Sequence, residues 1–271
     1  RAVMLRTANC LLGTDMGDDT LIVGTSGRYE FKNKGINVFL ESLNRLNRDK
    51  NLKKNILAFI NVPGWVGDAR DDLQKRLKSK EKFNTPLEVP FITHWLHNMT
   101  HDQVLDMLKY MGMSNHPEDK VKVVFVPCYL DGKDGILNKQ YYDLILGEDL
   151  SVYPSYYEPW GYTPLESVAF HVPTITTDLA GFGLWVNSLK NQHGINDGVE
   201  VLHRSDYNYS EVADGIKDTI SAFSAKTDAE VKEIRKRAGQ VAEQALWKHF
   251  IEYYYEAYDF ALRHAMQRQL G

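Results

Sequence analysis

Cysteine is scarce in this sequence: among 271 residues there are only Cys10 and Cys128, far apart. Two such cysteines exclude a disulfide framework and match no zinc-ligand spacing, so they indicate a reducing compartment, the cytoplasm. Long apolar runs are also lacking, because none approaches the ~20 residues that a membrane-spanning helix needs. The first residues have no long apolar centre of an export signal, so we expect no membrane association.

Positive charge is not in excess either. The formal net charge is -4, and the lysines and arginines are scattered. This excludes the broad basic surface that nucleic acid or anionic lipid would require. Two phosphate-binding patterns are absent: there is no Gly-x4-Gly-Lys-Ser/Thr loop, and no Gly-x-Gly-x-x-Gly follows a strand. Any bound anion is therefore expected to be small and held by another motif.

What is present is an alternation of short apolar runs with stretches of helical apolar spacing. Strands are predicted over residues 21–23, 56–60, 121–126, 151–153, 173–176 and 199–202. Helices are predicted over residues 1–12, 36–46, 68–80, 104–111 and 141–146, around Trp185, and from Ser210 onward. This order predicts an α/β fold, a Rossmann-like parallel sheet with helices on both faces plus C-terminal helices. Ligands of such sheets bind beyond the carboxyl ends of the strands.

The first candidate site is residues 27–35, where a predicted strand ends and a helix begins. Arg28 could hold a diphosphate through a bidentate fork and Lys34 as a point charge. The amides at the start of the following helix would add to the attraction. The residues alone leave a second interpretation open, a solvated charged loop.

The second candidate site is residues 154–166, again between a predicted strand and a helix. Pro164 fits the first helical turn, with Thr163 as the N-cap. The amides near Gly161, Tyr162 and Leu165 would then be free to hold phosphate or sugar oxygens.

Two carboxylates in this segment, Glu158 and Glu166, stand eight residues apart. They could accept hydrogen bonds from separate hydroxyls of an extended ligand, and sugars present such hydroxyls. In the alternative interpretation, Glu166 only stabilises a helix N-terminus and Glu158 caps a turn.

Three histidines, His94, His97 and His101, would share one face of a helix if residues 94–101 were helical. We do not expect a metal site here. Pro90 and the loop context favour a hydrogen-bonded turn, and no carboxylate is evident as a further ligand.

These motifs resemble the eukaryotic-type glycogen synthases. The resemblance rests on residues 27–35 and on residues 153–183, which include the family's Glu-x7-Glu pattern at Glu158 and Glu166. It implies the C-terminal domain of a GT-B glycosyltransferase, in which two Rossmann-like domains face each other across a cleft. The chain begins without an initiator Met inside a predicted helix, so we interpret it as a fragment that lacks the N-terminal GT-B domain. Residues 1–245 would bind the nucleotide sugar, and residues 246–271 would form a helix packing back toward the missing domain.

Carried over residue by residue, the resemblance assigns roles to the candidate residues. The phosphate-binding cations of the family fall on Arg28 and Lys34, and the glutamate beside the donor glucose falls on Glu158. The ribose-binding glutamate falls on Glu166. The aromatic pair that sandwiches uracil falls on Tyr129 and Tyr141, although two core tyrosines remain an alternative for this pair.

The resemblance implies retaining transfer of glucose from a nucleotide-glucose donor, UDP-glucose in most of the family, to the 4-hydroxyl of a glycogen or other α-1,4-glucan acceptor. It implies no metal and no pyridoxal phosphate as cofactor, and a homo-oligomer. The arginine-rich regulatory helix of the family has a counterpart of only Arg235, Lys236 and Arg237, so activation by glucose 6-phosphate is not expected.

Other functions stay open at this point. Another GT-B enzyme, such as a glucan phosphorylase or a sucrose- or trehalose-type synthase, shares the fold, and a phosphorylase would need pyridoxal phosphate. A non-catalytic glucan- or nucleotide-binding module is the alternative outside enzymes. The choice between UDP-glucose and ADP-glucose is not fixed by spacing.

Overall fold

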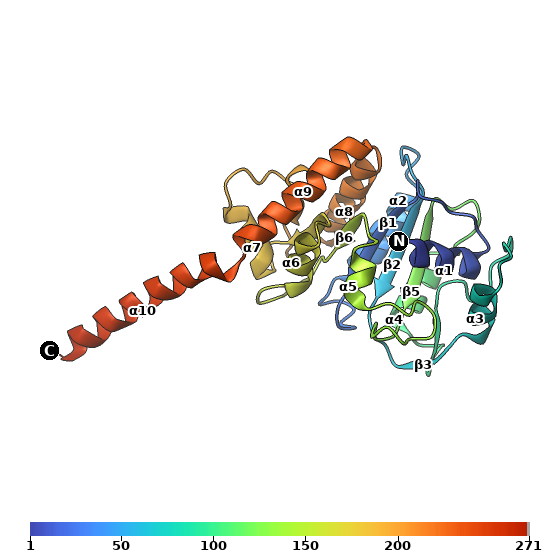
Figure 1. The fold of residues 1–271 in the computed structure, drawn as a ribbon, viewed down its shortest axis with the longest axis horizontal. Coiled ribbons are helices and arrows are strands. Elements are labelled where there is room, and N and C mark those ends of the chain that lie inside the picture. Colours follow the sequence, from blue (N-terminus) through green and yellow to red (C-terminus); the bar gives the residue numbers. More distant parts are fainter. Residues whose placement is uncertain (270–271) are drawn as a thin grey trace.

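A six-stranded parallel sheet forms the centre of the computed structural model, which describes residues 1–269 (Figure 1). Its strands are β1 (Leu21–Ser26), β2 (Ile56–Asn61), β5 (Val121–Val126), β6 (Leu150–Val152), β7 (Thr174–Thr177) and β8 (Val199–Leu202). Their order is β5-β2-β1-β6-β7-β8, and every neighbouring pair is parallel. The six predicted strands and the α/β fold class are confirmed.

Helices cover both faces of this sheet. They are α1 (Ala2–Leu12), α2 (Ile36–Asn47), α3 (Asp71–Lys78), α4 (Gln103–Tyr110), α5 (Tyr141–Ile145), α6 (Tyr162–Ala169), α7 (Gly181–Ser188), α8 (Tyr209–Ser224), α9 (Asp228–Gln244) and α10 (Trp247–Gln269), with a short 3-10 turn at Ile195–Asp197. One buried cluster packs α2, α4 and α8 on one face, through residues such as Phe39, Val104 and Ile216. A second cluster packs α1, α3 and α5 on the other face, through Leu11, Leu73 and Leu144.

A small second sheet was not predicted. β3 (Val66–Ala69) pairs antiparallel with β4 (His94–Leu96). The predicted helix over residues 68–80 therefore begins only at Asp71, because the chain first forms β3. The three histidines share no helix face: His94 lies in β4, and His97 and His101 lie in the loop that follows this strand.

The last helix, α10, projects away from the body of the molecule (Figure 1). Only its beginning is packed: the Phe250 ring lies 5.4 Å from the rings of both Trp160 and Trp185, measured between centroids. Farther along, large apolar side chains such as Tyr258 and Phe260 are exposed.

Within residues 1–269 no helix has the length and apolarity needed to cross a membrane. The boundary at residue 245 and the packing of α10 on a missing domain stay predictions, and residues 270–271 of that segment lie outside the described residues.

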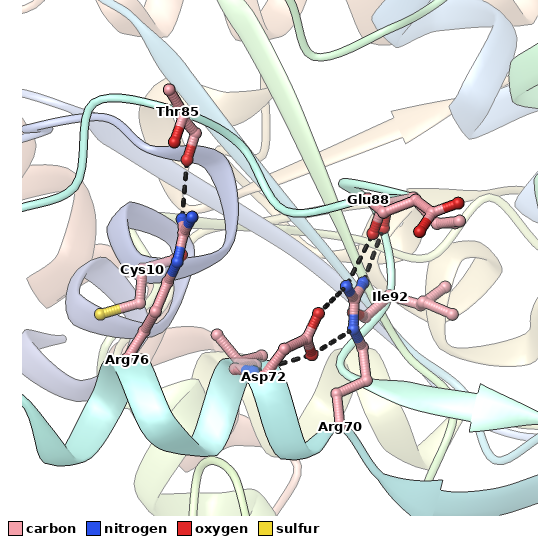
Figure 2. Close-up of polar contacts among 9 residues, drawn as sticks. Cys10, Arg70, Asp72, Arg76, Thr85, Glu88 and Ile92 are labelled. Carbon is pink, nitrogen blue, oxygen red and sulfur yellow. Dashed lines mark hydrogen bonds and ion pairs between the residues drawn. The ribbon is translucent and has the colours of Figure 1, made fainter.

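The loop before β4 is held by a fully buried arginine, Arg70, at the N-terminus of α3 (Figure 2). Its guanidinium donates to both carboxylate oxygens of Asp72, at 3.1 and 2.7 Å. It also donates to the backbone oxygens of Glu88 (2.6 Å), Val89 (2.8 Å) and Ile92 (3.3 Å). All five N–H groups of the side chain are therefore used. The same loop includes Val89 at φ 48°, a left-handed conformation that is unfavourable for a β-branched residue.

A second buried ionisable side chain, that of Glu148, precedes β6. Its carboxylate accepts a hydrogen bond from the Ser151 hydroxyl at 2.7 Å. It also lies against Gly24 in β1, where an added Cβ would come within 2.0 Å of a carboxylate oxygen, so a larger residue there would have to displace the Glu148 side chain. Burial raises the pKa of Glu148 to about 8 from an ordinary value of 4.5. The folded protein therefore holds this side chain as the neutral acid at pH 7.

We predict that replacing Glu148 with glutamine removes part of the pH dependence of stability. Because folding raises this pKa, the contribution of Glu148 is complete below pH 4.5 and is lost as the pH rises toward about 8. A neutral glutamine loses nothing over this range. Urea unfolding of both proteins between pH 5 and pH 8.5 should show the variant gaining stability relative to the original as the pH rises. Parallel pH profiles for the two proteins would contradict the neutral buried acid.

Candidate functional site

The two candidate loops lie side by side because their strands are neighbours. β1 ends at Ser26 and β6 ends at Val152, and the two strands pair in parallel. The loops that follow them therefore leave the same edge of the sheet, where ligands of such folds bind. A backbone hydrogen bond from Tyr156 to the carbonyl of Asn33 joins the loops directly, at 2.7 Å.

The first loop turns back on itself between two glycines. Gly27 and Gly35 both have positive φ, 140° and 69°. Gly35 is the N-cap of α2, and an added Cβ would lie 2.0 Å from the carbonyl oxygen of Pro154, so glycine lets the two loops approach closely. Between them, Arg28 extends into solvent with 75% of its side chain exposed and pairs with Glu30 at 2.8 Å.

Lys34 and Glu158 form an ion pair between the two loops. Only 14% of the Lys34 side chain and 19% of the Glu158 side chain are exposed. The residues are 124 positions apart in the sequence. The fold therefore joins the lysine of the first candidate site to the first glutamate of the second.

The second loop ends at α6, whose start differs from the prediction. The predicted N-cap, Thr163, is wrong, because Gly161 takes a left-handed conformation, φ 105°, and the helix already begins at Tyr162. Pro164 lies in the first turn, as predicted. Among residues 1–269 no side chain caps this helix start, so its first amides are available for an anion, and Leu165 lies one residue beyond the proline.

Glu166 lies on α6 and accepts a hydrogen bond from the hydroxyl of Tyr142 at 3.0 Å. This hydrogen bond raises the pKa of Tyr142. The Tyr142 ring stacks at an angle on Phe170, with 5.3 Å between centroids. Sequence reasoning did not single out Tyr142 beyond its place next to Tyr141, although the structure shows that it orients one of the candidate carboxylates.

Tyr129 and Tyr141 line one hollow of about 430 Å³, together with Ser26, Arg28 and Thr163. Their surroundings differ. Tyr129 is 78% exposed, whereas Tyr141 is half-buried with its hydroxyl 2.6 Å from the Ser26 hydroxyl, and burial raises the Tyr141 pKa. The interpretation of two core tyrosines therefore does not hold for Tyr129.

The predicted site residues thus share one edge of the sheet. Arg28 and Lys34 come from the loop after β1, Glu158 from the loop after β6, and Thr163 and Glu166 from the start of α6. An anion and a flat ring could be held together here, since cations and free helix amides attract the anion and exposed aromatic rings stack on the ring.

The histidines do not gather into a site. The His97 ring stacks on Trp65, 5.2 Å between centroids, and His101 lies in a loop. His94 does have a carboxylate nearby, which spacing did not reveal: its ring, the Cys128 sulfur and the Asp134 carboxylate lie within 4.8 Å of one another. Both His94 nitrogens, however, contact oxygens of Thr93 (2.8 Å) and Asp134 (2.7 Å).

The Asp134 carboxylate is also engaged. It accepts hydrogen bonds from the backbone amides of Ile136, Leu137 and Asn138, at 2.7 to 3.0 Å. Burial raises the pKa of the Cys128 thiol to about 12. Within residues 1–269 this cluster shapes a loop next to the hollow, and the His94 nitrogens and the Asp134 carboxylate already have hydrogen-bond partners.

Known proteins that are similar to this chain in sequence are glycogen synthases. The family model described as glycogen synthase matches residues 12–69 and 67–270. The glycogen [starch] synthase of Neurospora crassa is 28% identical over 92% of this chain and 42% of its own length. Isoform 2 from Saccharomyces cerevisiae is also 28% identical, over 91% of this chain and 43% of its own length. The chain therefore spans about two fifths of the length of these relatives.

One solved structure supports the fold. A pneumococcal O-GlcNAc transferase, GtfA, solved with UDP and GlcNAc, superposes with a TM-score of 0.50 at 13% sequence identity. The superposition covers 93% of this chain and 38% of the transferase. At this identity the likeness concerns the fold alone, which is that of one domain of a GT-B glycosyltransferase.

Proposed function

This chain belongs to the glycogen synthase family, and from that premise we propose that it is the donor-binding part of a retaining glucosyltransferase. In the whole protein, glucose would pass from a nucleotide sugar to the 4-hydroxyl of an α-1,4-glucan end. The observation that carries the proposal is the contact of Lys34 with Glu158, with Arg28 and the start of α6 at the same edge of the sheet.

The reaction needs positive charge where the leaving group departs. As the bond between the anomeric carbon and the diphosphate oxygen breaks, negative charge grows on the diphosphate. Arg28, Lys34 and the α6 amides at Tyr162 and Thr163 would bind this charge more tightly in the transition state than in the ground state. The acceptor 4-hydroxyl would pass its proton to an oxygen of the departing diphosphate as its own oxygen bonds to the anomeric carbon, with retained configuration.

The carboxylates would orient the sugar groups. Glu158, held by Lys34, would accept hydrogen bonds from hydroxyls of the donor glucose. Glu166, held by Tyr142, would accept hydrogen bonds from the ribose. Tyr129 and Tyr141 would contact the base in the hollow that they line. Stacking of this kind contributes ~1–3 kcal/mol per base in single-stranded nucleic acid complexes.

The acceptor contacts and the exclusion of water would come from the domain that faces this one across the cleft, so the chain alone is expected to bind the donor without turnover. We further propose that the whole protein works in the cytoplasm as a homo-oligomer. Light scattering of the full-length protein tests the oligomer.

Calorimetric titration of this chain with UDP, ADP and their glucose esters tests the donor. We expect the preferred nucleoside diphosphate and its glucose ester both to bind. Lys34 should contribute to the affinity through the diphosphate, and Glu158 should contribute to the affinity for the ester through the glucose. The Glu158→Gln chain should then lose affinity for the glucose ester but keep its affinity for the free diphosphate. A chain that binds none of the four compounds would contradict a donor site.

A further inference from the structure

The hollow beside Tyr129 contains a buried polar side chain that sequence reasoning missed. Asn61, the last residue of β2, is only 5% exposed. Within the described part of the chain, its side-chain oxygen has no hydrogen-bond partner. Buried polar atoms are nearly always paired, and an unpaired one is destabilising. An unpaired carboxamide that lines a hollow therefore points to a ligand.

The strand fixes the direction of this side chain. Side chains alternate along β2, and Leu57 and Phe59 belong to the buried cluster of α1, α3 and α5. Asn61 follows the same alternation and faces the side on which Cys128 and Tyr141 lie. All three line the hollow of about 430 Å³.

The nearest polar neighbour does not satisfy Asn61. Ser26 is its partner across the β1–β2 pair. The Ser26 hydroxyl is already 2.6 Å from the Tyr141 hydroxyl and 3.4 Å from that of Tyr153. The hydroxyls of Ser26 and Tyr141 thus bond to each other, and the Asn61 side-chain oxygen has no partner among the described residues.

The shape and chemistry of the hollow suit a heteroaromatic base. The other lining side chains include Pro63, Leu130 and the exposed ring of Tyr129, which offer flat apolar contact. A carboxamide presents one donor next to one acceptor, and the edges of uracil and adenine both present the complementary pair. Arg28 lines the same hollow, where it could reach the diphosphate joined to such a base.

We propose that Asn61 is a base-recognition residue, which binds the base of the nucleoside diphosphate through its side-chain amide. The proposal rests on the proposed function, because it needs a nucleoside diphosphate in this hollow. It adds base recognition by β2 to the stacking contacts of the two tyrosines and the phosphate contacts of the cations.

The test is calorimetric titration of the Asn61→Leu chain with UDP, ADP and inorganic pyrophosphate. Leucine has a similar volume but no hydrogen-bonding group. We expect affinity for the preferred nucleoside diphosphate to fall about 10-fold or more, since its base would lose its partner. Affinity for pyrophosphate, which has no base, should stay unchanged. Comparing the losses of affinity for UDP and for ADP shows which base the Asn61 amide binds.

Two further variants control for the substitution itself and for the size of the side chain at position 61. Asn51→Leu makes the same change at an exposed residue in the turn that precedes β2 by five positions, and should leave all three affinities unchanged. Asn61→Ser keeps a polar group with less volume and should also lose nucleotide affinity, with circular dichroism confirming the fold. Equal losses for nucleotide and pyrophosphate, or no loss at all, would overturn base recognition by Asn61. If the original chain binds pyrophosphate and nucleotides while Asn61→Leu is unaffected, the donor site stands without this contact.

Discussion

Replacing Lys34 with methionine in the full-length protein is expected to lower the rate of glucosyl transfer by ~10²–10³. The ammonium group lies in a mostly buried position between the two loops, where its charge is little screened by water. Methionine keeps much of the length of the side chain but cannot offset the charge of the departing diphosphate. Steady-state transfer of labelled glucose from the nucleotide donor to glycogen measures the effect.

Matched variants separate this explanation from a general loss of positive charge. Lys82 is 80% exposed and pairs with Asp15, so Lys82→Met should leave the rate unchanged. Glu158→Gln keeps the shape of the glutamate but weakens the hydrogen bonds that it would accept from the donor glucose, and a lower rate is expected there as well. If full-length Lys34→Met and Glu158→Gln both turn over normally, the site only binds, and a non-catalytic module becomes the better interpretation.

The sheet could be predicted because its strands are short stretches rich in apolar and β-branched residues between polar loops. The small sheet could not, because Val66–Ala69 is neither continuously apolar nor buried and His94–Leu96 has only three residues. The start of α6 was missed by two residues, since Pro164 marks the first turn but does not show that Gly161 can adopt a left-handed conformation. Local patterns thus locate elements better than they locate their ends.

The residues of the candidate site could be named from sequence, but their contacts could not. The pair of Lys34 and Glu158 requires that β6 lie next to β1, although β2 follows β1 in the chain. The hydrogen bond of Tyr142 to Glu166 likewise depends on how α5 lies beside α6. Asn61 gave no signal at all, because an asparagine at the end of an apolar run looks like an ordinary turn residue. Asn61 stands out only in the structure, where its side chain is buried and its side-chain oxygen has no hydrogen-bond partner among the described residues.

Replacing Arg70 with methionine is expected to destabilise the chain by about 3 kcal/mol, because three backbone oxygens lose a hydrogen-bond donor. The guanidinium is fully buried, and its removal would leave the backbone oxygens of Glu88, Val89 and Ile92 without their donors. The unfavourable φ of Val89 would then have little to hold it. Urea unfolding of this chain at neutral pH measures the loss as a lower midpoint.

Two other variants show whether geometry or charge is responsible for the Arg70 effect. Arg70→Lys keeps the charge but lacks the planar fork that reaches Asp72 and the loop together, so most of the loss should persist. Arg76→Met, also on α3, removes hydrogen bonds to the backbone oxygens of Cys10 (2.9 Å) and Thr85 (2.7 Å) (Figure 2). Because Arg76 is partly exposed, water can replace these bonds, and about 1 kcal/mol is expected. Full stability in Arg70→Lys would show that charge alone suffices, and similar losses in Arg70→Met and Arg76→Met would show that burial of Arg70 adds nothing.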